Sequence, residues 1–209
     1  MIIPTKATCV PGDFVLKDGT MLPKDITLTD TQKSNVAAVI VRAAADGKPA
    51  IGVGIVHNKM AWCKQSAAGY NTKITALQGN KTSDYMDGSD GWEKLKKACS
   101  DAESNPENYP AWNYSLTYAK TNGLTGDLAT GWYLPTVAEL YTIYQNKTVV
   151  DESLSKAGGS TFGTGNYWSC CQLPSLNNDA RVLVFGNGSM GYYSKSHYNL
   201  YVCSVMAFN

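Results

Sequence analysis

The residues that most often carry out chemistry in this chain are six cysteines and two histidines. The cysteines form no C-x-x-C pair, and with only His57 and His197 beside them a closed zinc site is not expected. A serine or cysteine nucleophile needs a histidine within reach. His57 follows an apolar run and is interpreted as a strand-end residue, whereas His197 lies in a polar aromatic stretch typical of a contact surface. We therefore expect no catalytic residue, no metal and no cofactor.

Cys170 and Cys171 are adjacent, so a disulfide between them would close a strained ring, and we expect the cysteines to be mostly free. Two other kinds of chemistry remain as alternatives. One is an enzyme that uses Cys170 or Cys171 as its nucleophile. The other is a calcium-dependent carbohydrate lectin, which lacks a set of acidic ligands in the tail because Asp179 is the only carboxylate there.

Tyrosine, serine and asparagine are prominent in the last forty residues. Tyr192, Tyr193, Tyr198 and Tyr201 offer broad amphipathic contact area at low rotamer cost, while Ser and Asn provide adaptable hydrogen bonds. This composition resembles that of an antibody paratope. A strand that simply turns its tyrosines to solvent would have the same composition, so composition alone leaves both interpretations open.

Length and charge set further limits. The chain has 209 residues and 44% hydrophobic residues, enough for a single domain, 1–209, with a real core. Its 18 Lys+Arg and 17 Asp+Glu give a net charge of +1, so no nucleic-acid partner is expected. Arg42 interrupts the longest apolar run, which predicts no transmembrane segment. Residues 1–6 do not resemble an export signal, and a lipid anchor outside this chain stays open as a means of attachment.

The elements that must position these residues follow the order strands, helices, strands. Thr136 and Glu139 form a capping box before an apolar stripe, which predicts a helix starting there. Asn187-Gly188 predicts a hairpin turn. The other predicted strands are 13–17, ending in a turn at Asp18-Gly19, 36–41, 51–56, 180–185, 189–193 and 200–208, and the other predicted helical segments are 92–99, capped by Ser89 or Asp90, 112–123 and 149–157. This order predicts an α+β domain in which antiparallel strands from both chain ends share one sheet and helices pack beside it.

Three segments, 12–19, 131–140 (Gly-Trp-Tyr-Leu-Pro-Thr-Val-Ala-Glu-Leu) and 166–169 (Asn-Tyr-Trp-Ser), resemble bacterial C-type-lectin-like domains related to the formylglycine-generating-enzyme fold. The tail 167–208 resembles the variable region of diversity-generating retroelement variable proteins. The resemblance implies that mutagenesis of AAY codons changes side chains on a lectin-like scaffold. It also implies a non-catalytic protein at the cell surface or outside the cell, whose partner is a macromolecule, expected to be a protein.

The genetic code provides a check on this resemblance. Changing the first two bases of AAY never yields Lys, Glu, Gln, Met or Trp, and between Ser169 and Cys203 only Gln172, Met190 and Lys195 are of these types. We therefore interpret these three as scaffold positions, with variable residues in 173–189 and 196–203. Cys170, Cys171 and Cys203 stand where the family usually has small polar or basic residues and are interpreted as products of diversification.

Two residue sets follow from the resemblance. The predicted invariant core includes Trp132, Leu134, Trp168, Phe185, Val205 and Phe208. The predicted ligand contacts are Cys171, Leu173, Ser175, Leu176, Asp179, Arg181, Tyr192, Tyr193, Ser196, His197, Tyr198, Leu200 and Tyr201.

Overall fold

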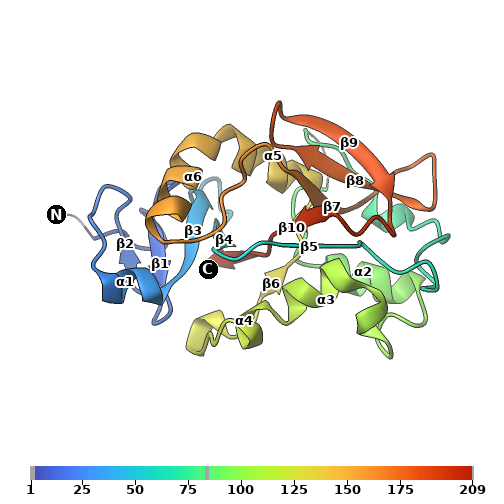
Figure 1. Cartoon of the computed structure of the whole chain (residues 1–209), viewed down its shortest axis with the longest axis horizontal. Coiled ribbons are helices and arrows are strands. Elements are labelled where there is room, and N and C mark those ends of the chain that lie inside the picture. Colours follow the sequence, from blue (N-terminus) through green and yellow to red (C-terminus); the bar gives the residue numbers. More distant parts are fainter. Residues whose placement is uncertain (1–2, 83–84, 209) are drawn as a thin grey trace.

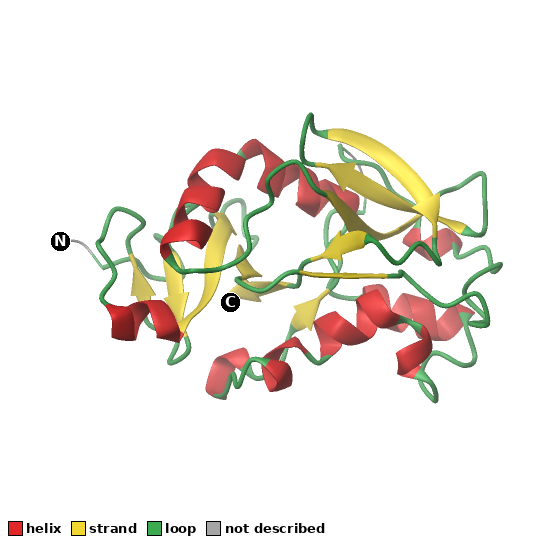
Figure 2. Ribbon diagram, viewed as in Figure 1, coloured by secondary structure: helices red, strands yellow, loops and turns green. Residues whose placement is uncertain are grey.

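The computed structural model describes residues 3–82 and 85–208. Residues 1 and 2, which belong to the segment 1–6 considered above, therefore lie outside the described residues. The described part is an α+β arrangement of two sheets with helices on both sides (Figures 1 and 2). The strands are β1 (Phe14–Leu16), β2 (Met21–Leu22), β3 (Val36–Arg42), β4 (Ala50–Gly54), β5 (Asn58–Met60), β6 (Trp132–Tyr133), β7 (Asn166–Gln172), β8 (Asp179–Val184), β9 (Ser189–Ser194), β10 (Leu200–Val202) and β11 (Val205–Phe208). The helices are α1 (Asp30–Asn35), α2 (Gly91–Ala98), α3 (Pro110–Leu116), α4 (Tyr118–Thr121), α5 (Val137–Gln145) and α6 (Lys147–Lys156), with 3₁₀ turns at Thr75–Leu77, Pro106–Asn108 and Gly126–Leu128.

The larger sheet joins the two ends of the chain, as the sequence predicts. Its strand order is β2-β1-β3-β4-β11-β6, with all pairs antiparallel. The last strand, β11, lies between β4 and β6, with Val205 opposite Val53 and Phe208 opposite Ala50. Gly52 permits this approach, because a Cβ there would lie 2.7 Å from the Phe208 ring.

The second sheet, in the order β5-β10-β7-β8-β9, is made almost entirely from the tail. β8 and β9 form the predicted hairpin, and Gly188 takes a positive φ of 70° in its turn. β10 runs parallel to β7, while the remaining pairs are antiparallel. β9 is one of the two edge strands of this sheet and lies at the edge of the molecule in Figure 1.

The predicted single strand 200–208 is wrong, because the chain changes sheets in its middle. β10 ends at Val202 and β11 begins at Val205 in the other sheet. Between them, Ser204 is fully buried, its carbonyl accepts from Gly54 N at 2.9 Å and its hydroxyl lies 3.1 Å from Ser115 Oγ. These contacts hold the crossing point without a glycine or proline that would have marked it in the sequence.

The helices lie on opposite sides of the sheets, α5 and α6 on one and α2 to α4 on the other (Figure 1). The predicted capping box is confirmed: Thr136 Oγ1 accepts from Glu139 N at 3.1 Å, and Glu139 Oε2 accepts from Thr136 N at 2.8 Å. Asp90 precedes α2 but makes no side-chain cap hydrogen bond and pairs with Lys94 at 2.9 Å instead. The predicted helical segment 112–123 is two helices, α3 and α4, which meet at Thr117.

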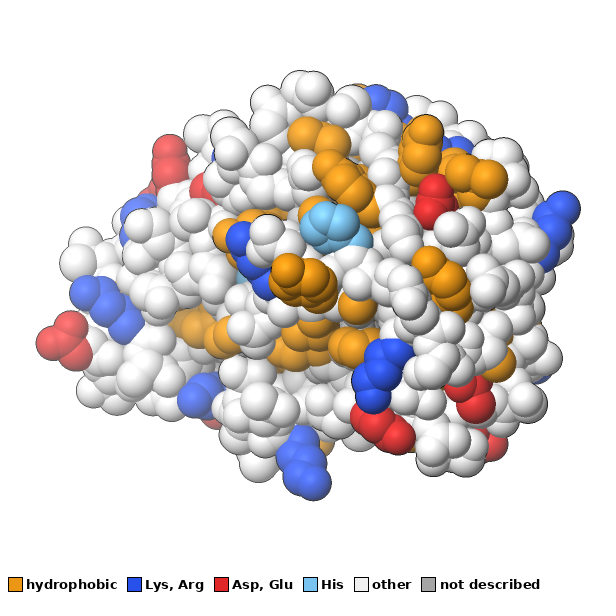
Figure 3. Space-filling view, turned by 45° about the vertical axis from the view of Figure 1, so that its right-hand side comes forward, with side chains coloured by type: hydrophobic (Ala, Val, Ile, Leu, Met, Phe, Trp, Pro, Cys, Tyr) orange, Lys and Arg blue, Asp and Glu red, His pale blue; other side chains and the backbone are white. Residues whose placement is uncertain are grey.

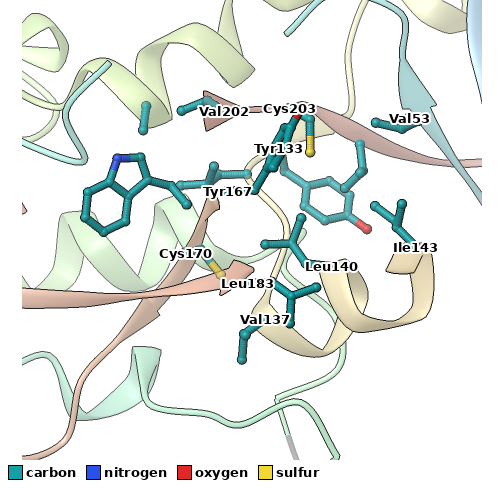
Figure 4. Packing of buried hydrophobic residues seen from close by; sticks show 14 of the residues in the cluster. Val53, Tyr133, Val137, Leu140, Ile143, Tyr167, Cys170, Leu183, Val202 and Cys203 are labelled. Atoms are coloured by element: carbon teal, nitrogen blue, oxygen red, sulfur yellow. The ribbon is translucent and has the colours of Figure 1, made fainter. Parts of the chain in front are cut away.

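The core lies between the two sheets and α5, and a second cluster covers the other face of the larger sheet. Figure 4 shows Val137 and Leu140 of α5 beside Leu183 of β8, with Cys170 close by. The six predicted core residues are all buried: Trp132, Leu134, Trp168, Phe185, Val205 and Phe208. The prediction of their placement is therefore confirmed.

Candidate ligand-binding surface

The thirteen predicted contact residues divide into three groups by exposure. Six are exposed to solvent: Ser175, Leu176, Tyr192, Tyr193, His197 and Tyr198. Three are half-buried: Arg181, Ser196 and Tyr201. Four are buried: Cys171, Leu173, Asp179 and Leu200. The expectation that these last four side chains face outward is wrong.

The burial of Cys171 follows from the position of β7 in the middle of its sheet. α5 covers one face of β7, and Cys171 Sγ accepts from Val137 N there at 3.5 Å. The segment around Trp62 covers the other face, where the indole donates to Ser169 O at 3.0 Å. With both faces covered, alternation along the strand no longer separates inward from outward residues.

Tyr193, His197 and Tyr198 form what we call the aromatic cluster. The ring centroids of Tyr193 and His197 lie 5.2 Å apart, and those of His197 and Tyr198 lie 6.2 Å apart in a stacked arrangement. Tyr198 is 79% exposed and Tyr193 36%. Asn166 Nδ2 donates to the Tyr193 hydroxyl at 3.3 Å. Apolar side chains gather with a histidine on the face turned forward in Figure 3. The cluster offers flat aromatic contact area, and Asn199 N donates to His197 Nδ1 at 3.3 Å.

Tyr192 is 56% exposed but belongs to the opposite side of the sheet. Successive residues in a strand point to opposite faces, and in the register Tyr192 lies opposite Arg181 while Tyr193 lies opposite Ala180. The predicted contacts therefore do not form one continuous face. The exposed tyrosines of β9 instead point to the two opposite faces of the sheet.

A cluster of hydroxyl groups lies where β9 ends. Ser194 Oγ lies 3.1 Å from the Tyr70 hydroxyl and 3.2 Å from Ser196 Oγ, which also accepts from Gln65 Nε2 at 3.5 Å. The hydrogen bonds with Ser194 and then Ser196 lower the pKa of Tyr70. Tyr70, Gln65 and Asn166 were missed from sequence. Tyr70 and Gln65 come from a distant loop that no tail motif indicates, and Asn166 begins the 166–169 motif without being predicted as a contact.

Lys195 fixes the loop that carries this surface from beneath. It is fully buried, its ammonium donates to Gly69 O at 2.5 Å and Tyr70 O at 3.4 Å, and it lies 4.7 Å from the centre of the Trp62 ring. Its main chain donates to Asn178 O at 2.8 Å and accepts from Cys63 N at 3.0 Å. Burial lowers the pKa of Lys195 to about 8. One residue thus ties together three loops.

Gln172 and Met190, the other two exceptions to the codon rule, also pack against the rest of the domain. Gln172 is fully buried, and its amide accepts from Ile74 N at 2.5 Å and donates to Thr72 O and Asn177 O at 2.9 and 2.7 Å. Met190 is half-buried and packs against the core. These placements agree with the prediction that the three residues are scaffold positions.

The cysteines and His57 occupy interior positions. Cys170, Cys171 and Cys203 are fully buried, and burial raises the pKa of Cys170 and Cys203. Interior packing does not fit their interpretation as products of diversification. His57 is also buried, with Nδ1 2.9 Å from the Tyr167 hydroxyl, and burial lowers its pKa to about 4.

Two further findings concern metals and membranes. Within residues 3–82 and 85–208, no group of three or more His, Cys, Asp or Glu side chains is placed to hold a metal ion. None of the helices in the same part of the chain has the length and apolar character needed to cross a bilayer.

Comparison with known proteins supplies a structural relative. No protein-family profile matches the chain, and no curated protein sequence matches it. Among solved structures, a fimbrial protein from Bacteroides ovatus superposes with a TM-score of 0.70 at 12% sequence identity. The match covers 96% of this chain and 49% of the fimbrial protein, so this chain spans about half of that protein's length. At this identity, the chain and the fimbrial protein share a fold.

Proposed function

We propose that this chain is a non-catalytic recognition domain that presents variable side chains on a C-type-lectin-like frame and binds a macromolecule, most simply a protein. The observation that carries this proposal is the aromatic cluster of Tyr193, His197 and Tyr198, which is exposed at the end of β9 and on the following loop, where the buried Lys195 anchors the chain. Large aromatic side chains on a rigid support are the usual anchors of protein interfaces.

The support beneath the cluster favours binding without prior folding of the loop. His197 N donates to Ser194 O at 2.8 Å, and Lys195 joins the loop to two other segments. Because the loop is already ordered, binding loses little conformational entropy there. The surface can then gain affinity from a few side chains rather than from a large area.

The likeness to a fimbrial protein supports a location at the cell surface for this chain as well. A surface location gives a diversified domain access to partners outside the cell. We accordingly place this chain at the cell surface or outside the cell, in agreement with the resemblance in its tail.

Sequencing the genomic neighbourhood tests the diversification directly. We expect a reverse-transcriptase gene and a near-identical repeat in which codons for exposed positions, such as Tyr192, Tyr193 and Tyr198, carry the variable adenines. Codons for the buried Gln172 and Lys195 should match between the two copies. A neighbourhood with no such repeat, or a repeat whose differences fall on buried positions, would contradict the proposal.

Binding is tested on a protein array and a glycan array probed with the purified chain. The variant with Tyr192, Tyr193 and Tyr198 all changed to alanine should lose the protein signal at least about tenfold, equal to about 1.4 kcal/mol, with a nearly unchanged Tm. Signal restricted to glycans and abolished by a chelator would favour the calcium lectin.

A further inference from the structure

The free edge of β9 is the least protected strand edge among the four that end the two sheets. The other edge strands are short: β2 and β6 have two residues each, and β5 has three, one of them Lys59. β9 has six residues, Ser-Met-Gly-Tyr-Tyr-Ser, with neither charge nor proline. Proteins usually protect edges with short strands, lysine or proline, because unpaired N–H and C=O groups pair readily with another chain.

The register shows which main-chain groups point away from β8. Lys195 N donates to Asn178 O, one step beyond the pair of Asp179 and Ser194. Because hydrogen-bonded and non-hydrogen-bonded pairs alternate in an antiparallel ladder, Met190 and Tyr192 direct their N–H and C=O groups to the open edge. Ser194 also points outward, and its carbonyl accepts from His197 N at 2.8 Å, which closes the edge at that end.

Two cations, Arg181 and Lys81, lie near β9, whereas the carboxylate of Asp179, opposite Ser194 in the register, is buried. Arg181 lies opposite Tyr192 in the register, and its Nε is buried without a hydrogen-bond partner. Lys81 Nζ donates to Gly188 O, just before β9, at 3.1 Å. No carboxylate of residues 3–82 and 85–208 forms a salt bridge with Arg181. Arg181 as a whole is only half-buried, so a carboxylate from outside the chain would approach the terminal nitrogens of this guanidinium rather than the buried Nε.

We propose that β9 pairs with an extended, acidic segment of a protein partner, which adds a strand to the edge at Met190 and Tyr192 and bonds to Arg181 through a carboxylate. The match is one of hydrogen bonds and of charge. An extended backbone alone supplies donors and acceptors at the spacing of alternate residues, and an acidic side chain complements the two cations.

This mode deepens the proposed function and rests on it. Main-chain hydrogen bonds do not depend on side-chain identity, so the edge would supply constant affinity while Tyr192 and Tyr193, on its two sides, supply specificity. A diversified domain could then change its side chains without losing its means of attachment to extended segments.

The test uses a phage-displayed library of random linear peptides as the probe and the complete chain as the target. Enriched peptides should contain Asp or Glu. In a synthetic copy of such a peptide, N-methylation at alternate residues should weaken binding about tenfold or more, whereas methylation of the residues between should leave it nearly unchanged. Amide exchange by NMR should slow at Met190 and Tyr192 on binding.

Matched variants distinguish peptide binding through the main chain of β9 from binding through its side chains. Tyr192→Pro removes one outward donor, and Tyr192→Ala removes the same ring but keeps that donor, so peptide binding should fall about tenfold further in the proline variant. Arg181→Gln should weaken acidic peptides, and Arg181→Lys should restore part of the loss. Thermal unfolding of every variant shows that the fold is retained.

Two results would overturn the edge mode. In the first, neither the methylation pattern nor Tyr192→Pro changes peptide binding, but alanine at both Tyr193 and Tyr198 abolishes it. The proposed function would then stand without strand pairing. The other is no enrichment of linear peptides by a chain that captures a folded protein on the array. Loss of the array signal as well, together with an absent template repeat, would instead count against the proposed function itself.

Discussion

β7 and β9 belong to the same sheet and are separated only by β8, but their surroundings are opposite. From Tyr167 to its end, β7 is buried, and Trp168 donates to Met60 O at 3.0 Å. No residue of β9 is buried, and its exposed tyrosines lie on both sides of the strand. Packing therefore fixes the side chains of β7, whereas the side chains of β9, one strand further out, are not enclosed by neighbouring elements.

The largest contrast should come from truncating one enclosed and one exposed aromatic residue. Trp168→Ala should lower the free energy of unfolding by about 3–5 kcal/mol, because it leaves a cavity and an unpaired carbonyl. Tyr198→Ala should stay within about 0.5 kcal/mol of the wild type. Urea unfolding of both variants measures the difference, and equal losses would remove the distinction between enclosed and exposed residues.

The pH dependence of the free energy of unfolding should also come from buried residues, namely Glu139 and His57. Glu139 accepts from Tyr133 at 2.7 Å and from two main-chain amides, but burial still raises its pKa to about 7. The folded state then binds more protons than the unfolded state between about pH 4.5 and 7, so stability falls as pH rises. His57, with its pKa lowered to about 4, acts in the opposite direction between about pH 4 and 6.5.

These two effects should nearly cancel in the wild type from about pH 4.5 to 6.5. Glu139→Gln should uncover the His57 effect, so that stability rises with pH by about 2 kcal/mol across this range. His57→Gln should give the opposite slope. Unfolding free energies at several pH values measure both slopes, and variants that run parallel to the wild type would refute this assignment.

A smaller contrast lies within β9 itself. Tyr193 bonds to β8 through its main chain, so Tyr193→Pro should remove a ladder hydrogen bond and cost about 1–3 kcal/mol. Tyr192 directs its N–H outward, so Tyr192→Pro should cost clearly less. Thermal unfolding of the two variants, with the alanine variant at each position as its control, tests the direction assigned to the edge. Equal losses would show that the assignment is wrong.

Much of this frame could be predicted from local signals. The capping box at Thr136 and the hairpin turn at Gly188 follow from short-range chemistry, and the meeting of the chain ends in one sheet follows from the order of strands and helices. The change of sheet at Ser204 could not be predicted, because tertiary hydrogen bonds hold it rather than a turn residue.

The candidate binding surface was only partly predictable for a related reason. Tyr192, Tyr193 and Tyr198 are exposed as expected, but Cys171 and Leu200 are buried because neighbouring elements cover both strands. In a strand that is covered on both faces, apolar and polar residues do not alternate, so the sequence does not show which side chains are exposed. The hydroxyl partner Tyr70 lies more than one hundred residues before Ser194, so only the folded chain brings the two together.

The most direct measurement is a complete substitution scan of residues 166–208 with folded protein on the yeast surface as the readout. We predict that positions 192, 193, 197 and 198 accept nearly all side chains, while Tyr167, Trp168, Gln172 and Lys195 accept almost none. A uniform tolerance along the segment, or intolerance at the exposed tyrosines equal to that of β7, would contradict the account.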